Sequence, residues 1–272
     1  MSPLWRDEVG ICLTPHSVLL NRVARGLHPK VVASETLEIH ETGSGSWTTA
    51  VVRLRQALQD TRWQNANLRI VVADMWARYC IIPPHPELAT DEERLRFGEH
   101  SLREIFGESM KDWASQLART ADDRPAIACA LPRAMLEEIL EISSAARLKL
   151  LSLQPHLVYA FNRVHDRIPD DSAWFVSIYD STLSAVRIEA RCWAEVRSVR
   201  IGKNWADEIK RLQAFGRLLN GQQAATRVLV DAPLWLRNVG TAFTDGLEWL
   251  EPQAGRAPTS LEQLSQQREL LA

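Results

Sequence analysis

The sequence predicts an α/β protein of two lobes, each built on the same order of secondary structure. Its 272 residues exceed the usual size of a single domain, so two medium lobes are expected. Three short apolar runs, an amphipathic helix and a buried strand occur in that order in the first half and again in the second. The two halves share no obvious residue identity, so the predicted duplication is one of topology.

The first half opens with three apolar, β-branched runs that predict an antiparallel meander. Thr14-Pro15-His16 separates the first two runs, and Gly26-Leu27-His28-Pro29 separates the second from the third. Ser46 is placed to cap a helix from Trp47 to about Leu58, because the apolar residues of that stretch fall on one face. The predicted strands of this half are residues 9–14, 17–24, 31–39 and 68–73.

The second half repeats the pattern. A helix over residues 205–219 has Asn204 as its natural cap and Asn220-Gly221 as its stop. A short helix is expected near residues 234–239. The predicted strands are residues 173–179, 183–190, 194–201, 227–230 and 246–250.

Three further segments set the expected domain limits. Between the two copies lie a strand over residues 126–131, a helix over 133–145 and a strand over 148–153. The polar stretch 166–171 marks a lobe boundary, which divides the chain into lobes 1–165 and 166–251. Residues 77–124 form an inserted subdomain whose helix opens with the capping box Thr90 to Glu93, and residues 252–272 form a linker with a short terminal helix.

Composition excludes several classes of function. The net charge of −2 and pI near 6.4 provide no global reason to bind nucleic acid or an anionic membrane, although such totals do not exclude local patches. The charged start and the lack of an apolar run of about 18 residues argue against a signal peptide and a membrane span, which predicts a cytoplasmic location. The four cysteines and seven histidines have no metal-ligand spacing, so no metal is expected.

Several stretches resemble the actin-like superfamily, which includes actin, heat-shock ATPases and sugar kinases. The opening meander from Val9 to Val23, the insert after Ala77, the segment Pro125 to Leu153 and the second meander ending at Gly202 occur in the family's order. Within this superfamily the chain is similar to PilM-type proteins of type IV pilus machines and, equally by pattern, to the cytoplasmic region of the type II secretion L protein. The resemblance implies two lobes of duplicated βββαβα topology, related to RNase H, with a small subdomain inserted in the first.

The phosphate-binding features that this resemblance implies are degenerate. Such ATPases use two glycine-bearing hairpin turns, each near an aspartate, because a Cβ atom blocks the approach of backbone N–H groups to phosphate. The first turn here contains Cys12 and Pro15, with neither glycine nor aspartate, and the second contains Asp180 and Ser181. The strand ending at Val230 continues into Asp231, where the family usually has a glycine pair. No cofactor and no catalytic residue are therefore expected, and Asp180 is better explained as a residue that satisfies its own turn.

The first hypothesis is a non-catalytic assembly protein of a pilus or secretion platform, peripheral to the inner membrane through its partner. The resemblance implies that it receives a short cytoplasmic peptide of an inner-membrane protein. Apolar residues of the inserted helix are candidates for that contact, although core packing explains several of them equally well: Leu95, Phe97, Leu102, Ile105 and Phe106. Two alternatives remain, an ATP-binding actin-like protein or small-molecule kinase with unconventional loops, and a filament-forming protein.

Overall fold

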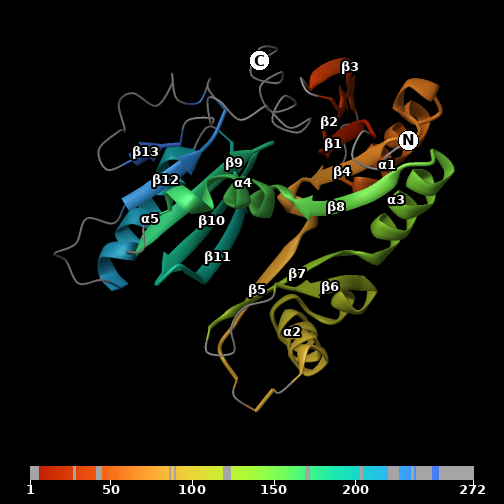
Figure 1. The fold of residues 1–272 in the computed structure, drawn as a ribbon. Coiled ribbons are helices and arrows are strands. Elements are labelled where there is room, and N and C mark those ends of the chain that lie inside the picture. Colours follow the sequence, from red (N-terminus) through yellow and green to blue (C-terminus); the bar gives the residue numbers. More distant parts are fainter. Residues whose placement is uncertain are drawn as a thin grey trace. The chain divides into compact units, whose positions relative to one another are not determined.

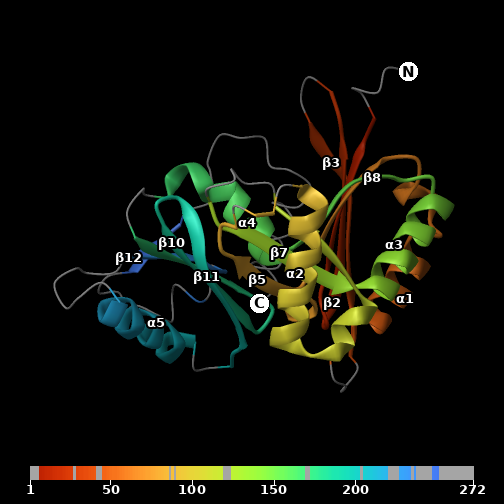
Figure 2. The same ribbon diagram turned by 90° about the horizontal axis from the view of Figure 1, so that it is seen from below.

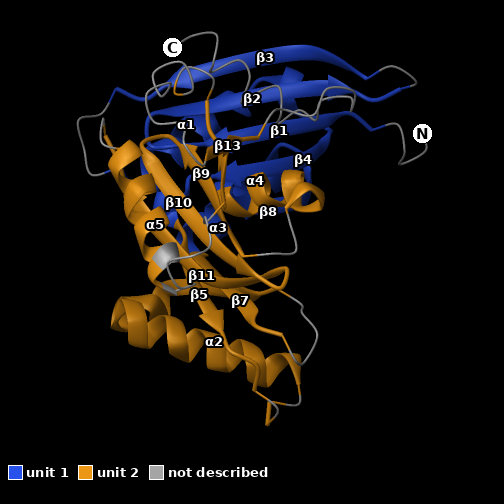
Figure 3. Cartoon of the chain, turned by 90° about the vertical axis from the view of Figure 1, so that its left-hand side faces the viewer, with its two compact units in different colours: residues 1–76, 133–156, 252–272 blue, residues 77–132, 157–251 orange. Residues whose placement is uncertain are grey.

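Two five-stranded sheets and one three-stranded sheet organise the chain, with the same strand order in both larger sheets. The computed structural model describes residues 6–26, 29–40, 45–85, 87–88, 90–118, 124–168, 172–202, 205–219, 227–233, 236 and 247–250. Contacts divide the chain into two units, drawn in blue and orange in Figure 3. Unit 1 comprises residues 1–76, 133–156 and 252–272, and unit 2 comprises residues 77–132 and 157–251.

Unit 1 is built on the sheet β3-β2-β1-β4-β8. The meander strands are antiparallel, whereas β4 and β8 run parallel to β1, and β1 is buried along its whole length. Side chains of α1 and α3 bury one apolar stripe each, and Arg55 of α1 forms an ion pair with Glu141 of α3 at 3.0 Å. Figure 2 shows these two helices side by side. The elements are β1 (Glu8–Leu13), β2 (Ser17–Ala24), β3 (Lys30–Glu38), α1 (Trp47–Ala57), β4 (Asn67–Val72), α3 (Arg133–Ala145) and β8 (Lys149–Pro155).

Unit 2 contains the second sheet, in the order β11-β10-β9-β12-β13. Its central strand β9 is buried on both faces, because alternate side chains pack against α5 and α4. Trp174 lies in one cluster with Trp205 and Ile209 of α5, and Phe175 contacts Phe161 of α4 with ring centroids 5.6 Å apart. The elements are α4 (His156–Val164), β9 (Ala173–Tyr179), β10 (Thr182–Glu189), β11 (Cys192–Arg200), α5 (Trp205–Leu219), β12 (Arg227–Asp231) and β13 (Leu247–Trp249).

The remaining part of unit 2 is a helix on a three-stranded antiparallel sheet, seen beside the labels α2, β5, β6 and β7 in Figure 1. Small residues let the helix approach the sheet closely. A Cβ atom on Gly98 would lie 3.2 Å from the Cβ of Ala128 and 2.8 Å from Ile82 Cδ1. Leu102 fills the core between helix and sheet. The elements are β5 (Arg78–Ile82), α2 (Asp91–Phe106), β6 (Trp113–Leu117) and β7 (Ala126–Pro132).

Most predicted elements lie within a residue or two of the observed ones, and the duplicated topology is confirmed by the shared strand order. Ser46 caps α1, and the capping box of α2 is formed by Thr90 and Glu93. The expected Asn204 cap, the Asn220-Gly221 stop, the tail after residue 251 and all but residue 236 of the helix near 234–239 lie outside the described residues.

The lobe limits remain a prediction, because the two units interleave along the chain. The predicted insert, residues 77–124, holds β5, α2 and β6, and the sheet that they share is completed by β7, which begins at Ala126. Within the described residues, the helices are too short or too polar to cross a bilayer.

Replacing the cap of α2 tests the local basis of this subdomain. The Thr90 hydroxyl accepts from the Glu93 amide at 3.1 Å, and the Glu93 carboxylate accepts from the Thr90 amide at 3.0 Å. We expect Thr90→Ala to lower the free energy of unfolding by about 1 kcal/mol in urea titrations, since it leaves helix amides without an acceptor. Ser109→Ala, an exposed serine of the same subdomain, is the control and should change little. Equal stability of both variants would contradict this role of Thr90.

Candidate functional site

The turn between β1 and β2 uses its backbone amides internally. The Thr14 amide donates to the Ser17 carbonyl oxygen at 2.9 Å, while the amides of His16 and Ser17 donate to Thr14 Oγ1 at 3.2 and 3.0 Å. Pro15 has no N–H group to donate. Every amide from residue 14 to 17 is thus absent or already bonded within the turn. This turn therefore offers no backbone donor to a phosphate oxygen, and Cys12 is buried in β1 just before it.

The turn between β9 and β10 has a different geometry. Asp180 and Ser181 have φ values of +48° and +61°, which the two central residues of a type I′ hairpin require. Glycine is favoured there because a side chain in the left-handed region is strained. Asp180 is half-buried and Ser181 is exposed. The turn between β9 and β10 thus has a backbone geometry suited to glycine but carries two residues with side chains.

Parallel strands in register bring several predicted and unpredicted polar residues to common sheet edges. In unit 2, Asp231 pairs with Ser177, so Asp231 and Asp180 lie at the carboxyl-end edge of β12 and β9. In unit 1, buried Thr14 and His156 directly follow β1 and β8, and buried Asp74 lies two residues after β4; the last residues of these strands pair with one another. Sequence reasoning missed Asp74 and His156, although both come just after predicted buried strands. Ligands of open α/β sheets bind outside this kind of edge.

These carboxyl-end residues do not assemble a metal site in the described part of the chain. No group of three or more His, Cys, Asp or Glu side chains there is placed to hold an ion. At these edges the carboxylates of Asp74, Asp180 and Asp231 can accept hydrogen bonds and order water.

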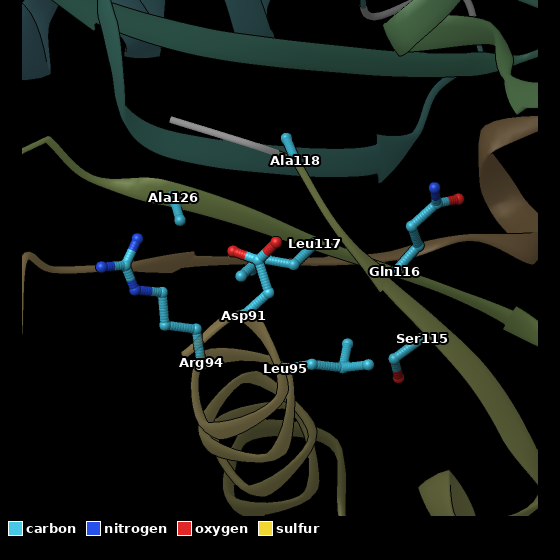
Figure 4. A pocket seen from close by; sticks show the side chains of 8 residues that line it. All are labelled: Asp91, Arg94, Leu95, Ser115, Gln116, Leu117, Ala118 and Ala126. Carbon is cyan, nitrogen blue, oxygen red and sulfur yellow. The ribbon is translucent and has the colours of Figure 1, made fainter. Parts of the chain in front are cut away.

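A pocket of about 190 Å³ lies between α2 and β6, and we call it the α2–β6 groove. Figure 4 shows Asp91, Arg94 and Leu95 of the helix facing the strand, with Leu117 directed toward Asp91. Gln116 points away from the helix (Figure 4) and is exposed. The lining combines an apolar floor with one acidic and one basic side chain. Its residues are Asp91, Arg94, Leu95, Ser115, Gln116, Leu117, Ala118 and Ala126.

The strand β6 is an edge strand of its sheet, and its register shows which backbone groups face outward. The Ala118 amide donates to the Ile127 carbonyl oxygen of the neighbouring chain segment at 2.9 Å. Because donors alternate along an antiparallel strand, Gln116 also bonds toward β7, whereas the backbone groups of Ser115 and Leu117 point to the open edge. The side chains of these same two residues line the α2–β6 groove.

The five predicted contact residues fall into three environments. Leu102 is fully buried and Phe97 packs against the same core, so core packing explains both. Leu95 lines the α2–β6 groove. Ile105 and Phe106, which end the helix, are 59% and 38% exposed. The helix phase fixed by Gly98 separates these groups, because residues 98 and 102 share the face toward the sheet.

Arg78 is a residue of this subdomain that sequence reasoning missed. Its guanidinium carbon lies 5.1 Å from the centroid of Trp113 and 5.6 Å from that of Phe106. Burial lowers the pKa of Arg78 from its usual value. The two aromatic faces stabilise the cation by cation–π attraction, and Arg78 in turn holds Phe106 at the end of α2.

Comparisons with known proteins identify the architecture. The sequence matches no family model and no curated protein. Among solved structures, a PilM–PilN type IV pilus biogenesis complex has a TM-score of 0.65 at 15% identity, covering 95% of this chain and 94% of that one. The chain has the actin-like fold. A Bacteroides thetaiotaomicron protein described as having an actin-like ATPase fold and unknown function gives a TM-score of 0.63 at 12% identity, covering 97% and 99%.

A third structure of the same architecture is the cytoplasmic domain of EpsL, an inner-membrane component of the type II secretion system of Vibrio cholerae. It gives a TM-score of 0.54 at 12% identity, covering 97% of this chain and 94% of that one. The fold expected from the sequence is thereby confirmed.

Replacing Ser181 by glycine tests the backbone geometry of the turn between β9 and β10. We expect Ser181→Gly to raise the free energy of unfolding by up to about 1 kcal/mol, because glycine adopts positive φ without a Cβ clash. Ser198→Gly, a replacement within β11 that also removes the 3.0 Å contact with Ser184, should lower it instead. A fall in stability for Ser181→Gly in urea titrations would show that the Ser181 side chain stabilises the turn.

Proposed function

We propose that the chain is a non-catalytic cytoplasmic assembly protein that docks an extended peptide of an inner-membrane partner in a type IV pilus or type II secretion platform. The observation that carries this proposal is the α2–β6 groove, in which an edge strand with outward backbone groups borders a pocket. The likeness to a PilM structure solved in complex with PilN, and to the EpsL cytoplasmic domain, supports the choice of machine.

The proposed binding mode is addition of the peptide as a fourth strand beside β6. The backbone groups of Ser115 and Leu117 supply main-chain hydrogen bonds, which give affinity without sequence specificity. Alternate side chains of an added strand point toward α2, where Leu95 and Leu117 accept an apolar group. Asp91 and Arg94 then favour a peptide with charges of both signs at neighbouring positions of that face.

The non-catalytic part of the proposal is supported by the first turn. Phosphate-binding loops present free backbone N–H groups, whereas the amides of Thr14, His16 and Ser17 are all bonded within their own turn. Opening this turn for a nucleotide would leave the buried Thr14 and Ser17 without their present hydrogen bonds.

A second candidate function, ATP binding, is favoured by the acidic residues at the carboxyl-end edges. Asp74, Asp180 and Asp231 occupy positions from which a carboxylate can organise metal-bound water, and Asp74 is buried. The two functions make opposite predictions about nucleotide.

Peptide docking on β6 is tested by a proline that removes one outward amide. Ser115→Pro eliminates a donor at the open edge but leaves the ladder with β7 intact, since the Ser115 amide faces away from it. The probe is a set of synthetic peptides that cover the cytoplasmic termini of inner-membrane proteins of type IV pilus and type II secretion platforms. We expect the variant to bind the peptide about tenfold more weakly, so that the Kd measured by calorimetry rises about tenfold. This is the effect of losing one main-chain hydrogen bond.

Ser115→Ala is the matched control, because it removes the hydroxyl and keeps the amide. Its Kd should stay within about twofold of the unchanged protein, because the outward amide that pairs with the peptide is retained. Equal losses in both variants would argue against strand addition. Failure of every peptide to bind would argue against the proposed function itself.

Thermal unfolding with and without millimolar Mg-ATP separates the two candidate functions. A ligand present at a hundredfold its Kd stabilises the folded state by about 2.7 kcal/mol, which corresponds to a rise of several degrees in Tm. We expect no such rise, because the first turn has no free amide. A rise that Asp180→Ala abolishes would establish the ATP-binding alternative.

A further inference from the structure

The amino ends of β1, β3, β4 and β8, together with the carboxyl end of β2, form a sheet edge opposite to the carboxyl-end edge described above. Strand pairing aligns one residue from each of the five strands in a single row across this edge: Val31, Val23, Glu8, Asn67 and Lys149. Lys30 precedes Val31 in β3 and lies one position further out from the row. With neighbouring strands about 4.8 Å apart, the row spans roughly 19 Å. We call this surface the basic edge, for the following reason.

Cationic side chains outnumber carboxylates there by two to one. Hydrogen bonds and strand register connect the basic edge to the loop before β4 and the turn before β8, so its charges are contiguous. The eight cations are Arg6, Arg22, Arg25, Lys30, Arg62, Arg69, Arg147 and Lys149, and the four carboxylates are those of Asp7, Glu8, Glu35 and Asp60. The formal excess is four positive charges, on a chain whose total is −2.

Much of that charge is held in place but not neutralised. Arg6 donates to the carbonyl oxygens of Asn65 and Arg147 at 3.2 and 2.9 Å, which fixes its position and leaves its charge uncompensated. Arg25 and Arg69 share the single buried carboxylate of Glu8. Such fixed guanidinium groups lose little side-chain entropy when they meet an anion.

Three further cations have side chains that form neither an ion pair nor a hydrogen bond with any described residue: Lys30, Arg147 and Lys149. All three are exposed. Arg147 and Lys149 lie two residues apart at the start of β8, while Lys30 starts β3 at the other side of the sheet. The unpaired charge is therefore spread across the whole row instead of being gathered at one point.

Two apolar side chains stand beside Lys30. Val31 and Val32 are 37% and 57% exposed. Val32 is the extra residue of a β-bulge between the pairs Val23–Val31 and Arg22–Ala33, so it has no partner on β2. Both side chains are therefore open to solvent at the start of β3. Figure 2 shows the β2–β3 hairpin (red) reaching beyond helices α1 and α3. A basic surface with a protruding apolar tip is the combination that interfacial membrane binding uses.

We propose that the basic edge of unit 1 binds the surface of an anionic lipid bilayer, with Val31 and Val32 entering the headgroup region. Lys and Arg side chains near such a surface each contribute to binding, and a spread of charge suits a flat array of headgroups. A single-stranded nucleic acid would favour exposed aromatic stacking platforms, whereas Trp63, the described aromatic residue beside Arg62, is fully buried. This contact would be direct, in addition to any tethering through a protein partner.

The test is co-sedimentation of the full chain with vesicles of phosphatidylcholine that contain either no anionic lipid or about 40% phosphatidylglycerol, whose negative surface potential attracts basic side chains. Binding should require the anionic lipid and fall as salt is raised. Lys30→Glu combined with Lys149→Glu cancels the formal excess, and we expect its partition coefficient to fall by tenfold or more. Val31→Ser combined with Val32→Ser should remove the fraction of binding that persists at high salt.

Arg103→Glu combined with Lys111→Glu is the matched control, because it changes the total charge equally at two exposed positions of unit 2. Circular dichroism establishes that each variant is folded. Equal losses in the two charge-reversed pairs, or binding to vesicles without anionic lipid, would overturn the proposal. So would absence of vesicle binding together with capture of polyglutamate or a DNA oligonucleotide, which would assign the edge to another class of partner.

Discussion

The in-register parallel pairing of β1, β4 and β8 is the constraint on which unit 1 depends. Because these strands start and end together, one edge of the sheet collects every residue that follows a strand, and the opposite edge collects every residue that precedes one. Thr14, Asp74 and His156 lie at the first edge, while Glu8 and Lys149 are aligned at the second. A slip of one residue would break this alignment and scatter both groups.

The same ladder explains how an actin-like fold can accommodate very different turns at the ends of its strands. The turn after β1 needs only to reverse the chain, and Thr14 achieves this by accepting from two amides with one hydroxyl. The turn after β9 reverses the chain through two residues of positive φ. Neither turn disturbs the strands, so the sheet accommodates side chains at both turns.

Local signals made most of the fold predictable from sequence. The apolar runs, the Ser46 cap and the capping box at Thr90 each depend on neighbours in the chain, and all of these appear in the structure. The candidate site was less predictable because it depends on distant pairing. Arg78 meets Phe106 and Trp113 only once the small sheet has formed, and the exposure of Ile105 against the burial of Leu102 depends on the helix phase at Gly98.

The open edge of β6 has a consequence for the isolated protein. Unpaired backbone groups on an edge strand bond to any strand of suitable length, including the β6 strand of a second molecule. Proteins protect such edges with charge, and here Asp91 and Arg94 stand beside the strand while its backbone stays open. Self-association at high concentration would follow from the vacant edge without any cytoskeletal filament, and occupation of that edge by a partner would suppress it.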